Sequence, residues 1–327
     1  MLLNGLARGQ AKLDLFYFIG WRKGRKLTNM KKYMPVMIAS FIWIWPAILI
    51  KMLSFYFDDY TQNFYRYLAG SSILIIINLF YHKKEFLRSL KRIPTFILPT
   101  ILLFIHQIAF VAGIRMLAPT IAVLIGKSSV LFTILFSFIF FSDERRIIKS
   151  KSFIFGSSLA IIGVCGVIIG KGNLYLDSFN LGTVLILMAS LCWTLYTIMM
   201  KPIVKEIDPF VSAGIVFSLS LPLFFVSTLL FGDIKALYVA PKSIIFILFL
   251  SGIFCVGIGN ALNYKSIKLI GTTITSNLIL VTPLFTAIFS YLILKEVLTP
   301  YQILSGIILL IGCYVLMSRG NRLLEET

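Results

Sequence analysis

Charged residues are scarce in this sequence. Of its 327 residues 13% are charged and 58% are hydrophobic, and the mean hydropathy is +0.93. Soluble domains usually carry about 25% charged and about 45–50% apolar residues. The composition therefore excludes a water-soluble enzyme built around one packed core. Ten membrane helices of about 20 residues each would need on the order of 200 residues, close to the hydrophobic share of the chain.

Acidic residues are the scarcer of the two charge types. The chain has 13 Asp and Glu against 31 Lys and Arg, which gives a formal net charge of +18. Such a balance often indicates a nucleic-acid partner, but here the basic residues lie between apolar runs. Loops rich in Lys and Arg are what orients a membrane protein. We therefore expect membrane lipid as the anionic partner, and no nucleic acid.

Residues that could hold a metal or carry out catalysis are also few. There are two histidines, His82 and His106, and the four cysteines all lie inside apolar runs without a CxxC pair. A zinc site or a disulfide framework needs a different pattern. We expect no metal, no cofactor and no catalytic residues. An integral-membrane enzyme that modifies lipids would need clustered His, Asp or Glu, and it remains an alternative class, as does a receptor or scaffold.

What the sequence does contain is a series of long apolar segments bounded by charge, Gly or Pro. They predict an all-α polytopic membrane protein with ten transmembrane helices. The predicted spans are 33–52, 62–81, 95–115, 120–141, 152–170, 181–200, 210–231, 244–264, 272–294 and 301–317. Residues 1–32 precede them as a basic tail, unless translation starts at Met30, and residues 318–327 follow them as a second tail.

The basic residues predict the orientation of these spans. If the N-terminus is cytoplasmic, 23 of the 31 Lys and Arg lie on the cytoplasmic side and seven on the other side. Lys127 is left over inside the fourth span. The excess places both termini in the cytoplasm of a multi-pass protein of the plasma (inner) membrane. By the same count Arg66 is expected near an interface, where a long side chain can reach the headgroups.

The two halves of the sequence resemble each other. At an offset of 150, Ala39, Ser40, Trp43, Ile48 and Lys51 match Ala189, Ser190, Trp193, Ile198 and Lys201. At an offset of 153, LFTILFSF from Leu131 matches LFTAIFSY from Leu284 at five of eight positions. Each half holds five spans, an odd number, so the second half must be inverted relative to the first. Inverted repeats are typical of secondary transporters, whose substrate site lies near the midplane.

The end of the second half carries a family resemblance. KEVLTPYQILSGIILLIGCYVL, from Lys295 to Leu316, has the Glu, Thr, Gln and two Gly that are typical of an EamA domain: Glu296, Thr299, Gln302, Gly306 and Gly312. The chain thus resembles the EamA family of the drug/metabolite transporter superfamily, with tandem domains at 33–170 and 171–317. The resemblance implies a ten-helix inverted repeat in which helices 1–4 and 6–9 surround a central cavity.

Lys127 is the main candidate for substrate binding. It lies near the centre of the fourth span, where a lysine costs about 2.5–3.5 kcal/mol on insertion scales. Its repeat mate is Leu280, so the fold itself does not demand a cation there. We expect Lys127 to contact an anionic group of the substrate. The alternative is a lysine satisfied by backbone carbonyls and cavity water.

Other polar and aromatic residues inside the spans complete the candidate site. His106 is a possible proton carrier, because its pKa ordinarily lies near neutrality; a hydrogen bond between helices is the alternative. Pro283 is expected to free backbone groups as a hinge or cavity wall. The remaining substrate-binding candidates are Gln107, Trp43, Trp193, Asn260, Tyr264 and Asn277. For each of them, helix packing is the alternative.

The sequence thus predicts a secondary transporter rather than an enzyme. We expect it to move a small metabolite by alternating access. By resemblance, export of an amino acid or related organic solute is the first expectation, and transport of a phosphorylated or nucleotide-like solute is the second. A homodimer is compatible with the pattern but is not required by it.

Overall fold

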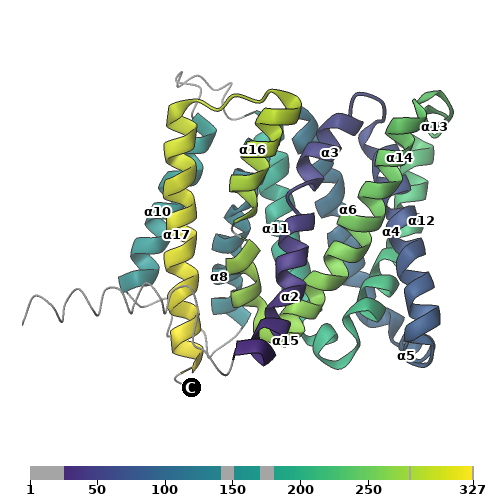
Figure 1. The fold of residues 1–327 in the computed structure, drawn as a ribbon, viewed down its shortest axis with the longest axis horizontal. Coiled ribbons are helices and arrows are strands. Elements are labelled where there is room, and N and C mark those ends of the chain that lie inside the picture. The colour runs from purple at the N-terminus through teal and green to yellow at the C-terminus, as the bar shows by residue number, and fades with distance from the viewer. Residues whose placement is uncertain (1–25, 141–150, 170–179, 280, 326–327) are drawn as a thin grey trace, which may run out of the picture.

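The structure, a computed structural model, describes residues 26–140, 151–169, 180–279 and 281–325, and over these ranges it is helical without a strand (Figure 1). In hydrocarbon a spanning segment must satisfy its own backbone hydrogen bonds, which an α-helix does. The elements are α2 (Lys26–Ile42), α3 (Pro46–Leu53), α4 (Asp59–Tyr81), α5 (Lys83–Ser89), η1 (Leu90–Arg92), α6 (Ile93–Met116), α7 (Pro119–Gly126), α8 (Ser128–Phe140), α10 (Lys151–Ile169), α11 (Leu181–Glu206), α12 (Pro209–Phe231), α13 (Ala236–Val239), α14 (Lys242–Ser251), η4 (Gly252–Ile258), α15 (Gly259–Ile279), α16 (Thr282–Leu294) and α17 (Pro300–Glu325).

The apolar helices match the predicted spans. Six helical segments are long and apolar enough to cross a membrane: Lys32–Leu53, Asp59–Tyr81, Lys83–Met116, Leu181–Glu206, Pro209–Phe231 and Lys242–Ile270. Four shorter apolar helices lie at Pro119–Thr133, Ile154–Val167, Thr282–Leu294 and Pro300–Val315. Each falls on one of the ten predicted segments, so the prediction of an all-α polytopic membrane protein is confirmed.

Several spans are less regular than the hydropathy pattern suggests. The first is interrupted between α2 and α3, and the fourth between α7 and α8. The eighth contains η4, a π-helix. The end of the expected eighth span and the start of the ninth both lie within α15. Hydropathy measures only how apolar a segment is, and such interruptions leave it almost unchanged.

The helices pack in pairs that reproduce the internal repeat. The largest contacts join α10 to α17, α11 to α6, α12 to α4 and α15 to α2. If each span of the first half is exchanged for its counterpart in the second, the pairs α10–α17 and α4–α12 map onto themselves. The pair α6–α11 then maps onto α15–α2. The contacts therefore have the pattern of a pseudo-two-fold pair of repeats.

Hydrogen bonds at the ends of α4 and α12 show that these two helices run in opposite directions. Asp58 caps α4 and accepts a hydrogen bond of 2.8 Å from the backbone N–H of Asp233, just beyond the end of α12. At the opposite end, Glu85 accepts one of 2.7 Å from the backbone N–H of Asp208, which caps α12. Since Asp58 and Asp208 are 150 residues apart, equivalent spans point in opposite directions, as Figure 1 also shows.

Glycines allow the supporting pair α10 and α17 to approach closely. A Cβ at Gly163 would lie 2.4 Å from the backbone nitrogen of Leu309, and one at Gly166 would lie 2.3 Å from the Ser305 hydroxyl. From α17, a Cβ at Gly312 would lie 2.4 Å from the backbone nitrogen of Ala160. These small residues therefore let the two helices pack backbone against backbone.

Candidate functional site

Interrupted helices mark the candidate site. Span 1 is interrupted at Trp43–Trp45, and Pro46 is the first residue of α3. At this position the backbone N–H has no partner within the helix, so a proline there loses no hydrogen bond. Span 4 is interrupted at Lys127, which lies between α7 and α8. In the second repeat, α15 ends at Ile279 and α16 begins at Thr282, next to the position that matches Lys127 at the offset of 153. Interrupted helices at membrane depth are where transporters place their ligand groups.

Lys127 lies directly at the interruption of span 4. Its backbone N–H donates to the carbonyl of Leu124 at 3.0 Å, and its Nζ donates to the Thr282 hydroxyl at 3.3 Å. Thr282 is buried at the start of α16. The side chain of Lys127 therefore reaches from the first repeat to the interruption of the second. An ammonium group has three donors, and this contact uses one of them.

Open space adjoins Lys127. A Cβ placed on Gly126 would meet no heavy atom within 4 Å, whereas one placed on any of the other described glycines compared in this way would meet a neighbour. The hydroxyl of Ser190 donates to the Gly126 carbonyl at 3.2 Å, and that of Thr194 donates to the Ser129 carbonyl at 3.0 Å. Ser190 of α11 therefore binds a carbonyl at the C-terminal end of α7, and Thr194 ties α11 to the first turn of α8.

Aromatic side chains from both repeats form a row beside the interruptions. The repeat mates Trp43 and Trp193 meet edge to face, with ring centroids 5.7 Å apart. Trp193 also lies 5.1 Å from His106 and 5.5 Å from Tyr196. Tyr196 in turn lies 6.3 Å from Tyr264. Four of the residues proposed from sequence are thus brought together, along with Tyr196, which sequence reasoning did not select.

His106 and Gln107 hold α6 to its neighbours. The Nδ1 of His106 lies 2.9 Å from the carbonyl oxygen of Ala189 in α11, a contact in which the ring nitrogen donates. Gln107 is buried, and its backbone carbonyl accepts a 3.5 Å hydrogen bond from the Asn63 amide. The contact of His106 is the interhelical hydrogen bond that the sequence offered as an alternative; a role in proton transfer stays a prediction.

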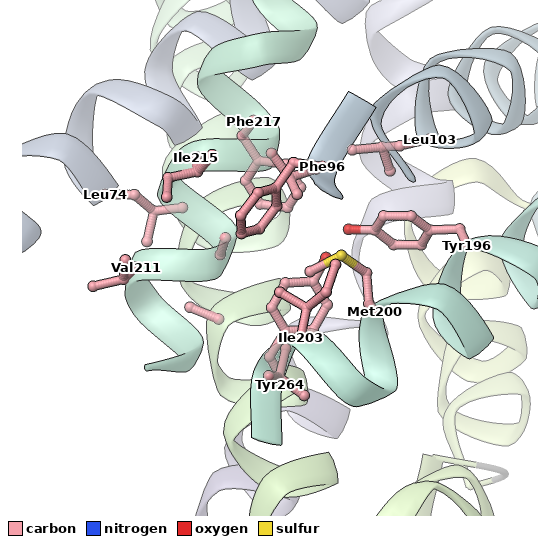
Figure 2. Packing of buried hydrophobic residues seen from close by; sticks show 14 of the residues in the cluster. Leu74, Phe96, Leu103, Tyr196, Met200, Ile203, Val211, Ile215, Phe217 and Tyr264 are labelled. Carbon is pink, nitrogen blue, oxygen red and sulfur yellow. The ribbon is translucent and has the colours of Figure 1, made fainter. Parts of the chain in front are cut away.

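Asn260 and Tyr264 lie on α15, immediately after the π-helix. The Asn260 amide donates to the carbonyls of Val256 at 2.9 Å and Cys255 at 3.3 Å, and its Oδ1 is buried without a partner. The hydroxyls of Tyr264 and Tyr196 are likewise buried and unpartnered. Figure 2 shows both tyrosines in the hydrophobic cluster that also contains Phe96 and Met200. The side chain of Asn277 lies outside the described residues.

Pro283 opens α16, one residue after Thr282. It therefore lies at a helix start, where no intrahelical hydrogen bond is lost. One turn further on, the hydroxyl of Thr286 donates to the backbone carbonyl of Ile44 at 3.1 Å. Since Ile44 lies within the interruption of span 1, α16 contacts the interrupted segments of both spans 1 and 4.

A polar network ties the repeats together at one end of the molecule. The Nζ of Lys51 donates to three carbonyls at the end of α6: those of Arg115 at 2.6 Å, Leu117 at 3.0 Å and Ile114 at 3.3 Å. The Glu296 carboxylate accepts from the backbone N–H of Thr120 at 3.2 Å and from its hydroxyl at 2.8 Å. A cation thus lies at a helix C-terminus and an anion at a helix N-terminus, the favourable arrangement for both helix dipoles.

Sequence reasoning missed a second cation within the spans, and this one is fully buried. Arg66 on α4 is 1% exposed, so the expectation that its side chain reaches an interface is wrong. Gln62 and Asn63, on the same helix face, are fully buried as well. Gln62 and Asn63 precede Arg66 by four and three residues, a spacing that places all three side chains on one side of a helix. This spacing could have identified the buried polar face from the sequence. The positive-inside count masked it, because that count assigned Arg66 to the side opposite the cytoplasm rather than to the interior of a span.

The described residues contain no group of three or more His, Cys, Asp or Glu that could hold a metal ion. What the arrangement offers is instead hydrogen-bond donors, aromatic faces and a cation. Such groups can bind and orient a polar solute.

Comparison with known proteins extends these observations. The EamA-like transporter family matches residues 30–169 and 180–318. A protein of Haemophilus influenzae described as an uncharacterized transporter is 28% identical over 84% of this chain and 93% of its own length. A second uncharacterized transporter, from Methanothermobacter thermautotrophicus, is 25% identical over 91% and 90%. A solved crystal structure with 14% sequence identity covers 90% of this chain and 99% of its own, with a TM-score of 0.61, and shares the fold.

The two family matches fall on the two halves that the internal repeat separates, and the polytopic helical fold agrees with them. The chain is therefore a multi-pass membrane transporter that belongs to the EamA-like transporter family.

Proposed function

We propose that this protein is a secondary transporter for a small metabolite that bears an anionic group, such as an amino acid or related organic solute, and that it exports this solute by alternating access. The observation that carries the proposal is Lys127, which lies at an interrupted helix beside the open space at Gly126. A cation at the interface of two repeats is well placed to select an anionic solute.

The position of the Lys127 ammonium group favours a role of this side chain in substrate binding over a role in folding. A lysine at the depth of a membrane span is costly and usually faces a cavity or a partner. The one described hydrogen bond of its ammonium group is to the neutral hydroxyl of Thr282. A carboxylate or phosphate group of the substrate would supply the missing negative charge, and Trp43 and Trp193 would pack on its apolar or cationic parts.

Alternating access fits the contacts between the repeats. Glu296 of the second repeat holds Thr120 of the first at one end, and Glu85 of the first holds Asp208 of the second at the other. Rocking of one repeat against the other requires one of these contacts to break while the other holds. We place both termini in the cytoplasm, as the basic residues predict, so that the Glu296 contact lies on the outer side of the plasma membrane.

Two steps test this proposal. Metabolites are first screened by thermal shift on the detergent-purified protein, because a ligand that binds the folded state raises its melting temperature. The hits are then assayed for flux in proteoliposomes. We expect saturable flux of a carboxylated solute. Flux of phosphorylated solutes alone would favour the second substrate class. No flux of any stabilising solute would contradict the proposal.

A further inference from the structure

The side chain of Arg66 is buried without a counter-charge. Its Nε donates to the Ser251 hydroxyl at 3.1 Å, while its Nη1 is buried without a partner. The ion pairs found among the described residues join Arg92 to Glu206 and Arg115 to Asp59, and Arg66 takes part in neither. An isolated buried charge is costly, so a guanidinium in this position implies a compensating group.

Two amides beside Arg66 are also incompletely satisfied. Gln62 donates to the carbonyl of Ile50 at 3.4 Å, and Asn63 donates to that of Gln107 at 3.5 Å. The Oε1 of Gln62 and the Oδ1 of Asn63 are both buried without a partner. Buried polar atoms in native proteins nearly always have a hydrogen-bond partner. Only one of these unpartnered atoms, Nη1 of Arg66, is a hydrogen-bond donor; the two amide oxygens are acceptors. Each amide nitrogen has two N–H groups and one described hydrogen bond, so the donors that could meet an anion are Nη1 and the second N–H of each amide.

The backbone around Arg66 is held closely. A Cβ on Gly252 would lie 2.4 Å from the carbonyl oxygen of Arg66, and one on Gly70 would lie 2.8 Å from that of Gly252. This approach fixes α4 against η4, and it places the Ser251 hydroxyl against the guanidinium. The element η4 is a π-helix, a rare conformation that often occurs at functional sites.

The second repeat shows that the fold does not require these polar groups. With Asp58 and Asp208 as equivalent caps, Arg66 corresponds to Val216, and Gln62 and Asn63 correspond to Ser212 and Ala213. All three residues of α12 are buried. The same helix face therefore carries small and apolar side chains in one repeat, and one charged and two amide side chains in the other.

From this geometry we propose a second anion site, distinct from Lys127, in which Arg66 binds a compact monovalent anion between α4 and η4. The amide N–H groups of Gln62 and Asn63 would assist, while Ser251, whose own proton is donated to the carbonyl of Leu248, accepts from Nε and positions the guanidinium. The anion is either a free ion, such as chloride, or the carboxylate of the transported solute. The second source rests on the proposed function; the first does not.

Thermal unfolding of the full-length protein in detergent tests the site. The probes are sodium chloride, bromide and acetate, each compared with sodium gluconate at the same ionic strength, because gluconate is too bulky for a closed site. We expect a saturable rise in melting temperature with the compact anions. Arg66→Gln should raise their apparent dissociation constant by at least about tenfold, since the charge-assisted hydrogen bonds are lost.

Arg92→Gln is the matched control, because it makes the same change at an exposed residue; it should alter the anion affinity by less than about twofold. Equal melting temperatures of the wild-type protein in all four salts, or an unchanged anion response in Arg66→Gln, would overturn the proposal. If Arg66→Gln does not fold, anomalous scattering from bromide in wild-type crystals decides: density at the Arg66 guanidinium supports the site, and its absence there refutes it.

A competition experiment identifies the source of the anion. If chloride weakens the binding of a solute found by thermal shift, the site takes the carboxylate of that solute. If chloride leaves solute binding unchanged, the site holds a resident ion. Because these readouts require no flux, a failure of the transport proposal stays distinguishable from a failure of the anion site.

Discussion

At the scale of single residues, the first repeat contributes two cations whose equivalents in the second repeat are apolar. Lys127 corresponds to Leu280, and Arg66 corresponds to Val216. Their surroundings differ: Lys127 is partly exposed at a helix interruption, whereas Arg66 is enclosed. Since the sequence has apolar residues at both equivalent positions, the repeated fold does not require either charge, and we propose a binding role for each.

The open space beside Gly126 allows a test of where the substrate lies. Gly126→Leu should fill that space and lower flux at least about tenfold by raising KM, because the solute and the new side chain compete for the same volume. Stability should hardly change, since an added Cβ meets nothing within 4 Å and glycine is a poor helix former. Proteoliposome kinetics and the melting temperature measure the two effects. An unchanged KM would exclude this space as the substrate site.

Gly163→Ala is the contrasting substitution. A Cβ there would lie 2.4 Å from the backbone of Leu309, and overpacking of this kind typically costs about 1–3 kcal/mol. We expect a lower melting temperature and a smaller yield of folded protein, measured in the same detergent. A melting temperature equal to that of the wild type would show that α10 and α17 pack differently.

At the scale of helices, the sequence predicts where the spans lie but not where they are interrupted. Long apolar runs fixed the number and positions of the ten segments, because burial in hydrocarbon depends on composition. The interruptions at Trp43–Trp45 and Lys127, and the π-helix η4, depend on tertiary contacts, such as those from Thr286 to Ile44 and from Ser190 to Gly126. No local sequence pattern predicts those contacts, although Pro46 and the Gly126–Lys127 pair are local signals of an interrupted helix.

The candidate site was predictable only in part, because the sequence shows which residues repeat but not which side chains meet in the fold. Trp43 and Trp193 were found as matched residues of the repeat, and they are in contact. Tyr196 and Arg66 were not found. A tyrosine hardly changes the mean hydropathy of an apolar segment, and the count of basic residues assigned Arg66 to a loop side. Gln62, Asn63 and Arg66 form a polar face of α4 that is visible only when the residues three and four positions apart on the helix are compared.

The cap of α4 makes the fold sensitive to acid. Burial raises the pKa of Asp58, but hydrogen bonds from Thr61, Asp233 and Tyr60 outweigh it, and the net pKa lies below the ordinary value of an aspartate. A lowered folded-state pKa means that the stabilisation is present above the unfolded-state pKa and is lost as the pH falls through the folded-state value. Melting temperature against pH should therefore fall at the acid end.

Asp58→Asn tests this account of the cap. Asn still caps a helix, but it carries no charge, so the variant should be less stable than the wild type at pH 7 by about 1 kcal/mol or less. The two melting temperatures should converge as the pH drops below the ordinary pKa of an aspartate. A difference between them that stays constant with pH would contradict the account.

At the scale of the whole molecule, two inverted repeats meet along the helix pairs α10–α17, α6–α11, α4–α12 and α2–α15. The contact between Glu296 and Thr120 joins the repeats at one end. Thr120→Cys combined with Glu296→Cys, in a background without the four native cysteines, should form a cross-link that lowers flux at least about tenfold, because rocking of the repeats gates transport. Reductant should restore the flux. Full activity of the cross-linked protein would show that this end does not open.

The most direct test of the central claim compares substrate affinity in wild-type protein, Lys127→Met and Lys127→Arg, measured by flux in proteoliposomes with the solute found by thermal shift. Lys127→Met preserves the approximate shape of the side chain without its charge, whereas Lys127→Arg preserves the charge. We predict a KM raised at least about tenfold for Lys127→Met and a smaller change for Lys127→Arg, with both proteins folded. Affinity and flux of Lys127→Met equal to those of the wild type would contradict the role of Lys127 in binding the substrate.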